Sequence, residues 1–194
     1  MGLSFSLLAL SRDGALDLSR PSEGAEADAA AVVQRLFPRT PHQLTQSRPL
    51  LQTAFPPRGT PVVGVFESGV LVATRDAHLY DPGILHARYR KLTEWPDVRL
   101  LTAASVNDMF AYGRWASGEL ARCFSVNAVA GVVRDRGTPD PFEEQLAVDP
   151  ENWLDLCNAA LASVLRLQGD AAPGFAGAVP WEDVTMHVFE RAHG

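Results

Sequence analysis

DMFAYGRWASGELARCFSVNAVAGVVRDRG, residues 108–137, is the stretch of sequence that decides the fold class of this chain. Two runs rich in aromatic and β-branched residues, 109–115 and 120–126, flank the tight turn Ala116-Ser-Gly-Glu119, in which glycine accepts a positive φ. A third run, 132–136, follows a second turn that also contains glycine. The pattern predicts a three-stranded antiparallel meander.

The middle run of this meander has apolar or small residues on both faces. Alternate positions place Leu120, Arg122, Phe124 and Val126 on one face, and Ala121, Cys123 and Ser125 on the other. A strand of this kind is typical of the inside of a sheet that is covered by a helix. We therefore expect a helix to pack over the meander.

Further strands are expected on both sides of the meander. Residues 3–10 alternate as a first strand, 62–66 and 70–74 form a hairpin, and 98–103 form another strand. Near the end of the sequence, alternating residues predict an edge strand at about 183–190. Most neighbouring strands are joined by hairpins, so the sheet is expected to be mainly antiparallel.

Three helices complete the expected fold. Apolar residues recur at helical spacing between Pro21 and Pro38, a short helix begins at Asp81-Pro82, and Asp149-Pro150-Glu151 begins a helix that ends near residue 168. We expect one α+β domain over residues 1–194, with the helices packed mostly on one face of the sheet. The segment at about 39–61, rich in Pro, Gln, Ser and Thr, is predicted to be a long irregular loop and a candidate functional segment.

Composition argues against several classes of protein. The chain has 194 residues, of which 46% are hydrophobic and 21% charged, and its formal net charge is −6. Lys91 is the only lysine and no basic run occurs, which argues against a nucleic-acid partner. The apolar start at residues 1–10 is too short to span a membrane. Two cysteines, Cys123 and Cys157, are expected as free thiols, and we expect a cytoplasmic protein with no cofactor.

The meander and the residues after it resemble a known family. The run DMFAYGRWASGELARCFSV (108–126), followed by GVVRDRGTPDPFEE (131–144), is similar to an actinobacterial family of uncharacterised proteins that is known only as a domain of unknown function. The N-terminal strand, the helix that ends at Pro38 and the Phe55-Pro56-Pro57 run are similar to it as well. The resemblance implies no activity, substrate or partner.

Glu143 and Glu144 are the candidate catalytic residues. One interpretation is a pair of carboxylates that act as acid and base with a nearby histidine. The other, which cross-strand pairing favours, is a structural ion pair with Arg114 or Arg122 that fixes the exit of the third strand. A ligand or partner surface is also predicted on the meander, formed by Tyr112, Arg114, Trp115 and Arg122.

Asp76, His78 and His86 are weak candidates for a metal site. Asp81, which lies between them, is better explained as a helix cap, and the short spacing of a motif such as HExxH is missing. No metal is therefore expected.

Two hypotheses about function follow from these patterns. The first is a non-catalytic binding, regulatory or immunity-like module that acts through the meander, the segment at 39–61, or both. The second is a small enzyme that uses Glu143 or Glu144. The absence of a nucleophile motif favours the first. The partner is expected to be a protein or a small molecule, and the chain a monomer or a homodimer.

Overall fold

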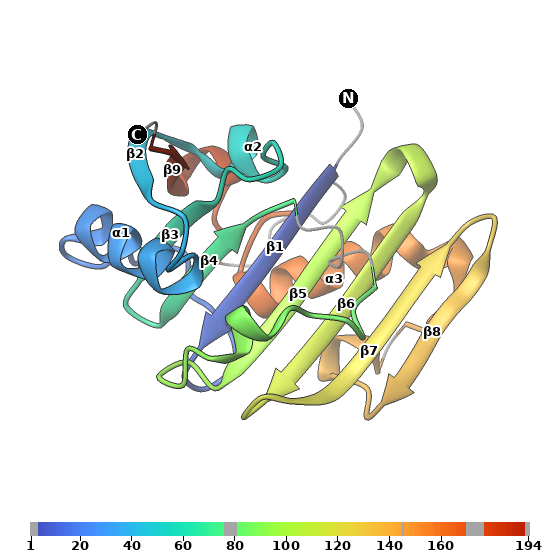
Figure 1. Cartoon of the computed structure of the whole chain (residues 1–194). Helices are drawn as coiled ribbons and strands as arrows, with labels where there is room; N and C mark the ends of the chain where they lie inside the picture. Colours follow the sequence, from blue (N-terminus) through green and yellow to red (C-terminus); the bar gives the residue numbers. More distant parts are fainter. Residues whose placement is uncertain (1–3, 76–80, 145, 170–176, 193–194) are drawn as a thin grey trace.

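The strands form one antiparallel sheet in the order β2-β9-β3-β4-β1-β5-β6-β7-β8 (Figure 1). This computed structural model describes residues 4–75, 81–144, 146–169 and 177–192. The strands are β1 (Ser4–Ser11), β2 (His42–Pro49), β3 (Val62–Phe66), β4 (Gly69–Ala73), β5 (Asp97–Ala104), β6 (Met109–Ala116), β7 (Glu119–Asn127), β8 (Gly131–Gly137) and β9 (Thr185–Arg191). The α-helices are α1 (Ala25–Leu36), α2 (Leu50–Thr53) and α3 (Trp153–Leu165). Strand residues outnumber helical ones, so the fold is mostly β.

The predicted meander is confirmed as β6-β7-β8, and β5 pairs with its first strand. The tight turn between β6 and β7 contains Ser117 and Gly118, both at positive φ. The hairpin of β3 and β4 is confirmed as well. These elements depend on tight turns and on the alternation of side chains, and both patterns are visible in the sequence itself.

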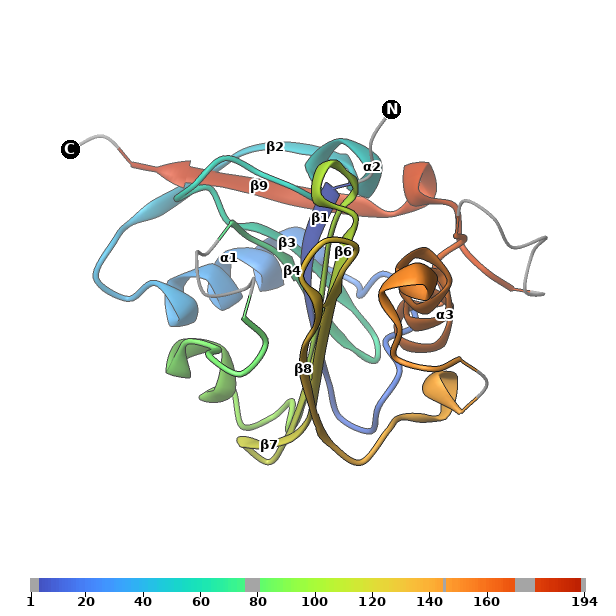
Figure 2. The ribbon, with the colours of Figure 1, turned by 90° about the vertical axis from the view of Figure 1, so that its right-hand side faces the viewer.

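The helices do not lie mostly on one face as expected, because α1 and α3 cover opposite faces of the sheet (Figure 2). Phe5, Leu7 and Ala9 of β1 pack in the cluster that contains α3. Leu8 and Leu10 pack in the cluster that contains α1. Since alternate residues of a strand point to opposite faces, the consecutive apolar residues of β1 require a cover on each side.

The last predicted strand forms, but it lies inside the sheet and not at an edge. β9 pairs with β2 on one side and with β3 on the other. The edge is β2, which forms within the segment predicted to be irregular. Both edge ladders are irregular, with register shifts between Leu44 and Gln46 and between Ser125 and Val126. Such bulges protect an exposed edge from pairing with other chains.

The short helix predicted from Asp81 to about Leu92 is reduced to one 3₁₀ turn, Ala87–Arg90. The Asp81 carboxylate accepts a hydrogen bond from the amide of Gly83 at 3.0 Å, which closes a local turn instead of starting a helix. The cap of the 3₁₀ turn is His86, whose side chain accepts from the amide of Arg88. Among the helices of the described ranges, none is both long and apolar enough to cross a membrane.

Candidate functional site

Arg122, on β7, is the centre of a buried ion-pair network. Its side chain is only 1% exposed, and Nε donates to both oxygens of the Glu143 carboxylate at 3.1 and 3.0 Å. Nη1 donates to the carbonyl of Arg136 at 3.0 Å and pairs with Asp135 on β8. Burial opposes the charge of Arg122, but the hydrogen bonds to Glu143 and Asp135 outweigh burial and raise the pKa of the guanidinium above its usual value.

A second ion pair joins this network through Asp140. Tyr112 Oη donates to Asp140 Oδ2 at 2.6 Å, and Arg114 pairs with the other carboxylate oxygen. The amide of Asp140 in turn donates to Glu143 Oε1 at 2.8 Å, as part of a capping box. Strands β6 and β7 are thus tied to the 3₁₀ turn Pro141–Glu143, and the chain that leaves β8 is fixed across the sheet.

Replacing Tyr112 by phenylalanine is expected to cost about 1–2 kcal/mol at pH 7, because Asp140 loses a buried donor. Burial raises the pKa of Tyr112 well above its ordinary value of 10.0. Above pH 10 the tyrosine therefore ionises in the unfolded chain before it does in the folded one, and its contribution to stability falls as pH rises. Urea unfolding at pH 7 and at alkaline pH should show a shallower alkaline loss in Tyr112→Phe. An identical alkaline loss in both proteins would contradict this assignment.

The meander residues predicted as a ligand surface do not share one surface. Tyr112, Trp115 and Arg122 are buried, and the Arg114 side chain is 27% exposed. Trp115 belongs to the cluster on the opposite face, with α1. The Glu143 carboxylate contacts Arg122 and the amide of Asp140, which is the structural pairing that cross-strand geometry favoured. Glu144 is adjacent and exposed.

The structure does not show the weak metal candidates Asp76, His78 and His86 close together in its described part. Asp76 and His78 lie outside the described residues. His86 accepts hydrogen bonds at Nδ1 from the backbone and side chain of Arg88. Among the His, Cys, Asp and Glu side chains in the described part of the chain, no group of three or more is placed to hold a metal ion.

One hydroxyl–imidazole pair was missed in the sequence. Ser47 of β2 lies opposite His187 of β9, and its Oγ is 2.9 Å from His187 Nδ1. Burial lowers the pKa of His187, which favours the neutral imidazole at pH 7. The sequence gives no sign of this pair, because the run 42–49 is polar and does not show the pattern of a strand, and Ser47 and His187 are 140 residues apart.

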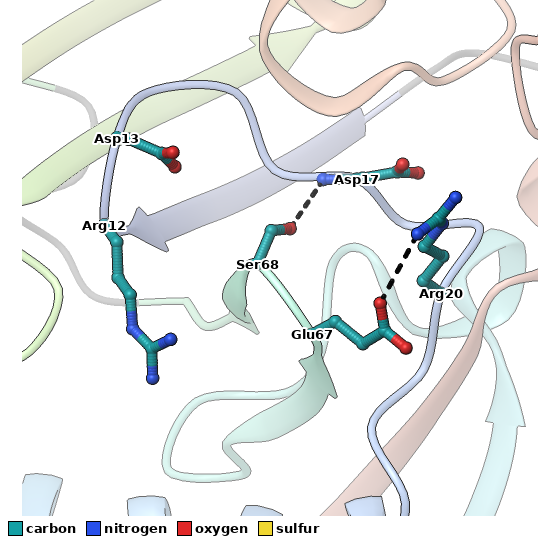
Figure 3. A pocket seen from close by; sticks show the side chains of 6 residues that line it. All are labelled: Arg12, Asp13, Asp17, Arg20, Glu67 and Ser68. Atoms are coloured by element: carbon teal, nitrogen blue, oxygen red, sulfur yellow. Dashed lines mark hydrogen bonds and ion pairs between the residues drawn. The ribbon is translucent and has the colours of Figure 1, made fainter.

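A hollow of about 300 Å³ opens beside the turn between β3 and β4 (Figure 3). Its lining mixes both signs of charge: Arg12, Asp13, Asp17, Arg20, Glu67 and Ser68. Arg20 pairs with Glu67 at 3.7 Å, and the amide of Asp17 donates to Ser68 Oγ at 2.9 Å. Hydrogen bonds from Ser19 lower the pKa of Asp17. Acids and bases here offset one another, so the hollow does not select a ligand of either charge.

A second hollow, of about 320 Å³, is strongly cationic, and we call it the arginine pocket. It is lined by Phe37, Thr40, His42, Gly59, Pro61, Thr74, Arg75, Arg88, Tyr89 and Arg191. The described lining includes three arginines and a histidine but no aspartate or glutamate. A hollow of about 630 Å³ along α1 shares Phe37, Thr40 and His42 with it.

Two of these arginines are held in place by aromatic rings. The guanidinium of Arg75 lies 4.5 Å from the centre of the Phe55 ring, and that of Arg88 lies 4.9 Å from the centre of the Phe37 ring. Nε of Arg88 also donates to His86 Nδ1 at 3.1 Å. Within the described ranges, neither arginine is in an ion pair with a carboxylate. Both side chains line the hollow, where the described lining holds no carboxylate.

The third arginine comes from the far end of the chain. Arg191 of β9 is the register partner of His42 of β2. The His42 ring packs on Phe37 with centres 5.1 Å apart, and Nδ1 donates to the carbonyl of Thr40 at 2.8 Å. The pocket is therefore assembled by the β2–β9 pairing together with the end of β4 and the 3₁₀ turn. No local sequence motif could have predicted the arginine pocket.

Comparison with known proteins gives one match. A model of a family described as a family of unknown function (DUF6928) matches residues 5–189, almost all of the described chain. No curated protein and no solved structure matches the chain.

Proposed function

Because the chain belongs to DUF6928, a family of unknown function, we propose from the site alone that it is a non-catalytic binding module whose ligand occupies the arginine pocket. The observation that carries this proposal is the convergence of Arg75, Arg88 and Arg191 on one hollow whose described lining has no carboxylate. Cations that are clustered without a carboxylate among them repel one another and attract an anion.

The polar groups of the meander support this proposal, because they form structural ion pairs with the turn Pro141–Glu143 and its cap. The carboxylate predicted as an acid or base, Glu143, is 1% exposed and is held by Arg122. A general base needs a free lone pair within reach of the substrate, and both Glu143 oxygens already accept hydrogen bonds from a cation. The segment at 39–61, in contrast, contributes Thr40, His42, Gly59 and Pro61 to the pocket.

The proposal predicts binding without turnover, and NMR of the full-length chain measures both. Backbone amides should be followed during titration with orthophosphate, phenyl phosphate, citrate and a neutral aromatic alcohol. At least one probe should shift the amides of Thr40, His42, Arg75 and Arg88, while those of β8 stay unchanged. The probes should be recovered intact. Shifts confined to β6–β8, or release of phenol from phenyl phosphate, would contradict a non-catalytic module.

A small enzyme remains the second candidate. As predicted from the sequence, this enzyme would use Glu143 or Glu144 with a histidine. The contact between Ser47 and His187 is a different pair, a hydroxyl beside an imidazole, and it also favours an enzyme. An active-site serine would be labelled by a fluorophosphonate probe. Labelling of the wild-type chain that is lost in Ser47→Ala would favour the enzyme over the binding module.

We further propose a cytoplasmic, actinobacterial setting, and a regulatory or immunity-like role in which ligand binding accompanies a protein partner. The Arg-rich, Lys-poor composition and the buried free thiols Cys123 and Cys157 support the setting. A toxin gene beside the gene for this chain would support the immunity-like role. Light scattering would distinguish a monomer from a homodimer.

A further inference from the structure

We propose that the arginine pocket recognises a phosphoryl group, carried by orthophosphate or by a small phosphate monoester. This inference rests on the proposed function and names its ligand class. The pocket gathers cations from three separate elements: Arg75 follows β4, Arg88 lies in the 3₁₀ turn and Arg191 ends β9. A ligand that contacts all three must accept hydrogen bonds in several directions at once.

The number of arginines in the pocket favours a phosphoryl group over a carboxylate. A carboxylate has two oxygens in one plane, which one guanidinium fork satisfies. A phosphate monoester has three terminal oxygens arranged around a tetrahedral centre and about two negative charges at neutral pH. Three guanidinium groups carried by separate elements supply enough donors for such a group, and Thr40 and Thr74 belong to the same lining.

The fixed positions of the arginines lower the cost of binding. The contacts with Phe55 and Phe37 restrict Arg75 and Arg88 before any ligand arrives, and the hydrogen bond from Arg88 Nε to His86 Nδ1 restrains Arg88 further. Long arginine side chains that are already ordered lose less conformational entropy on binding. Arg75 and Arg191 are exposed and Arg88 is half-buried, so the aromatic contacts position charges that solvent and a ligand can both reach.

A buried hydroxyl without a partner lies next to the pocket. Ser6 is 2% exposed, and its Oγ makes no hydrogen bond to the described residues. It stands beside Thr74, whose amide donates to the Ser6 carbonyl at 3.3 Å. Ser6, like Leu8 and Leu10, alternates toward the α1 face, where the pocket opens. Ser6 itself does not line the pocket, but its neighbour Thr74 does, so the unpartnered hydroxyl is adjacent to a lining residue.

Isothermal titration calorimetry of the full-length chain tests the inference. The probes are orthophosphate, phenyl phosphate, benzoate and benzyl alcohol at one ionic strength. Arg88→Gln and Arg75→Gln are compared with Arg136→Gln, which removes the same charge from β8. Loss of a charge-assisted contact should weaken phosphate binding roughly tenfold or more in the pocket variants, with little change in the control. The melting temperature of each variant, measured without ligand, shows that it is folded.

Each outcome decides the inference. The inference is supported if both phosphates bind more tightly than benzoate and if this binding is lost in Arg88→Gln but kept in Arg136→Gln. A preference for phenyl phosphate then identifies a monoester as the ligand, and equal affinity identifies free phosphate. Equal weakening in all variants indicates non-specific attraction and overturns it. Binding of benzoate or benzyl alcohol alone, with pocket amides shifted in NMR, overturns the phosphoryl group and leaves the proposed function standing. Shifts that avoid the pocket for every probe reject both.

Discussion

Replacing Arg122 by alanine is expected to lower the free energy of unfolding by about 3–5 kcal/mol, the largest effect of any substitution proposed for this chain. The substitution leaves the Glu143 carboxylate, 1% exposed, without the cation that neutralises it. It also removes the donor to the Arg136 carbonyl and the guanidinium that lies 5.2 Å from the centre of the Phe124 ring. Urea unfolding at pH 7, followed by tryptophan fluorescence, measures the loss.

Two controls separate the buried charge from the loss of side-chain volume. Arg134→Ala removes an arginine from a partly exposed pair with Asp81 and should cost only about 0–1 kcal/mol. The double variant Arg122→Met, Glu143→Leu replaces the buried pair by apolar residues of similar size and should recover most of the stability. A loss below about 1 kcal/mol in Arg122→Ala would mean that the ion pair is not buried as described.

Replacing Gly137 by alanine is expected to cost about 2–5 kcal/mol, the second largest effect. Gly137 is the register partner of Arg122 at the end of β8 and has a φ of +88°. A Cβ atom there would lie 2.0 Å from the carbonyl oxygen of Ala121, so the backbone of one strand would have to move. The shift would also disturb the geometry of Arg122.

Gly118→Ala is a matched control for this substitution. Gly118 has nearly the same backbone angle, with φ +84°, but a Cβ added there meets nothing within 4 Å. Its replacement should therefore cost only the conformational penalty, about 1–2 kcal/mol. The difference between the two midpoints of thermal unfolding isolates the collision with Ala121. Equal losses in the two variants would contradict the close approach of β7 and β8.

Local signals in the sequence were sufficient for the meander, the β3–β4 hairpin and the helices α1 and α3. The turns contain glycine and the strands alternate, so each element could be predicted without its neighbours. The run Leu7–Leu10 also carried the information that both sheet faces are covered, since a strand with only one covered face would alternate with polar residues. The expected packing of the helices mostly on one face was wrong because β1 places apolar residues against both α1 and α3.

Strand β2 could not be predicted, because its residues do not show the pattern of a strand. HQLTQSRP (42–49) is polar almost throughout and mostly exposed, as an edge strand beside solvent permits. Because β2 was not predicted, β9 had no second neighbour and was expected at an edge of the sheet. The arginine pocket was hidden for the same reason, since its cations come from segments about residues 75, 88 and 191 that only the sheet order brings together.

The place of β9 also has a consequence for how the protein is made. β2 has β9 as its only strand partner among the described elements, and Ser47 and His187 are 140 residues apart. At a synthesis rate of roughly 5–20 residues per second, β2 waits on the order of ten seconds for that partner to be translated. During this time the meander can fold on the ribosome, whereas β2 and the open side of β3 remain unpaired edges. The edge at β8 can therefore form before the edge at β2, and the half that carries the arginine pocket is the last to be completed.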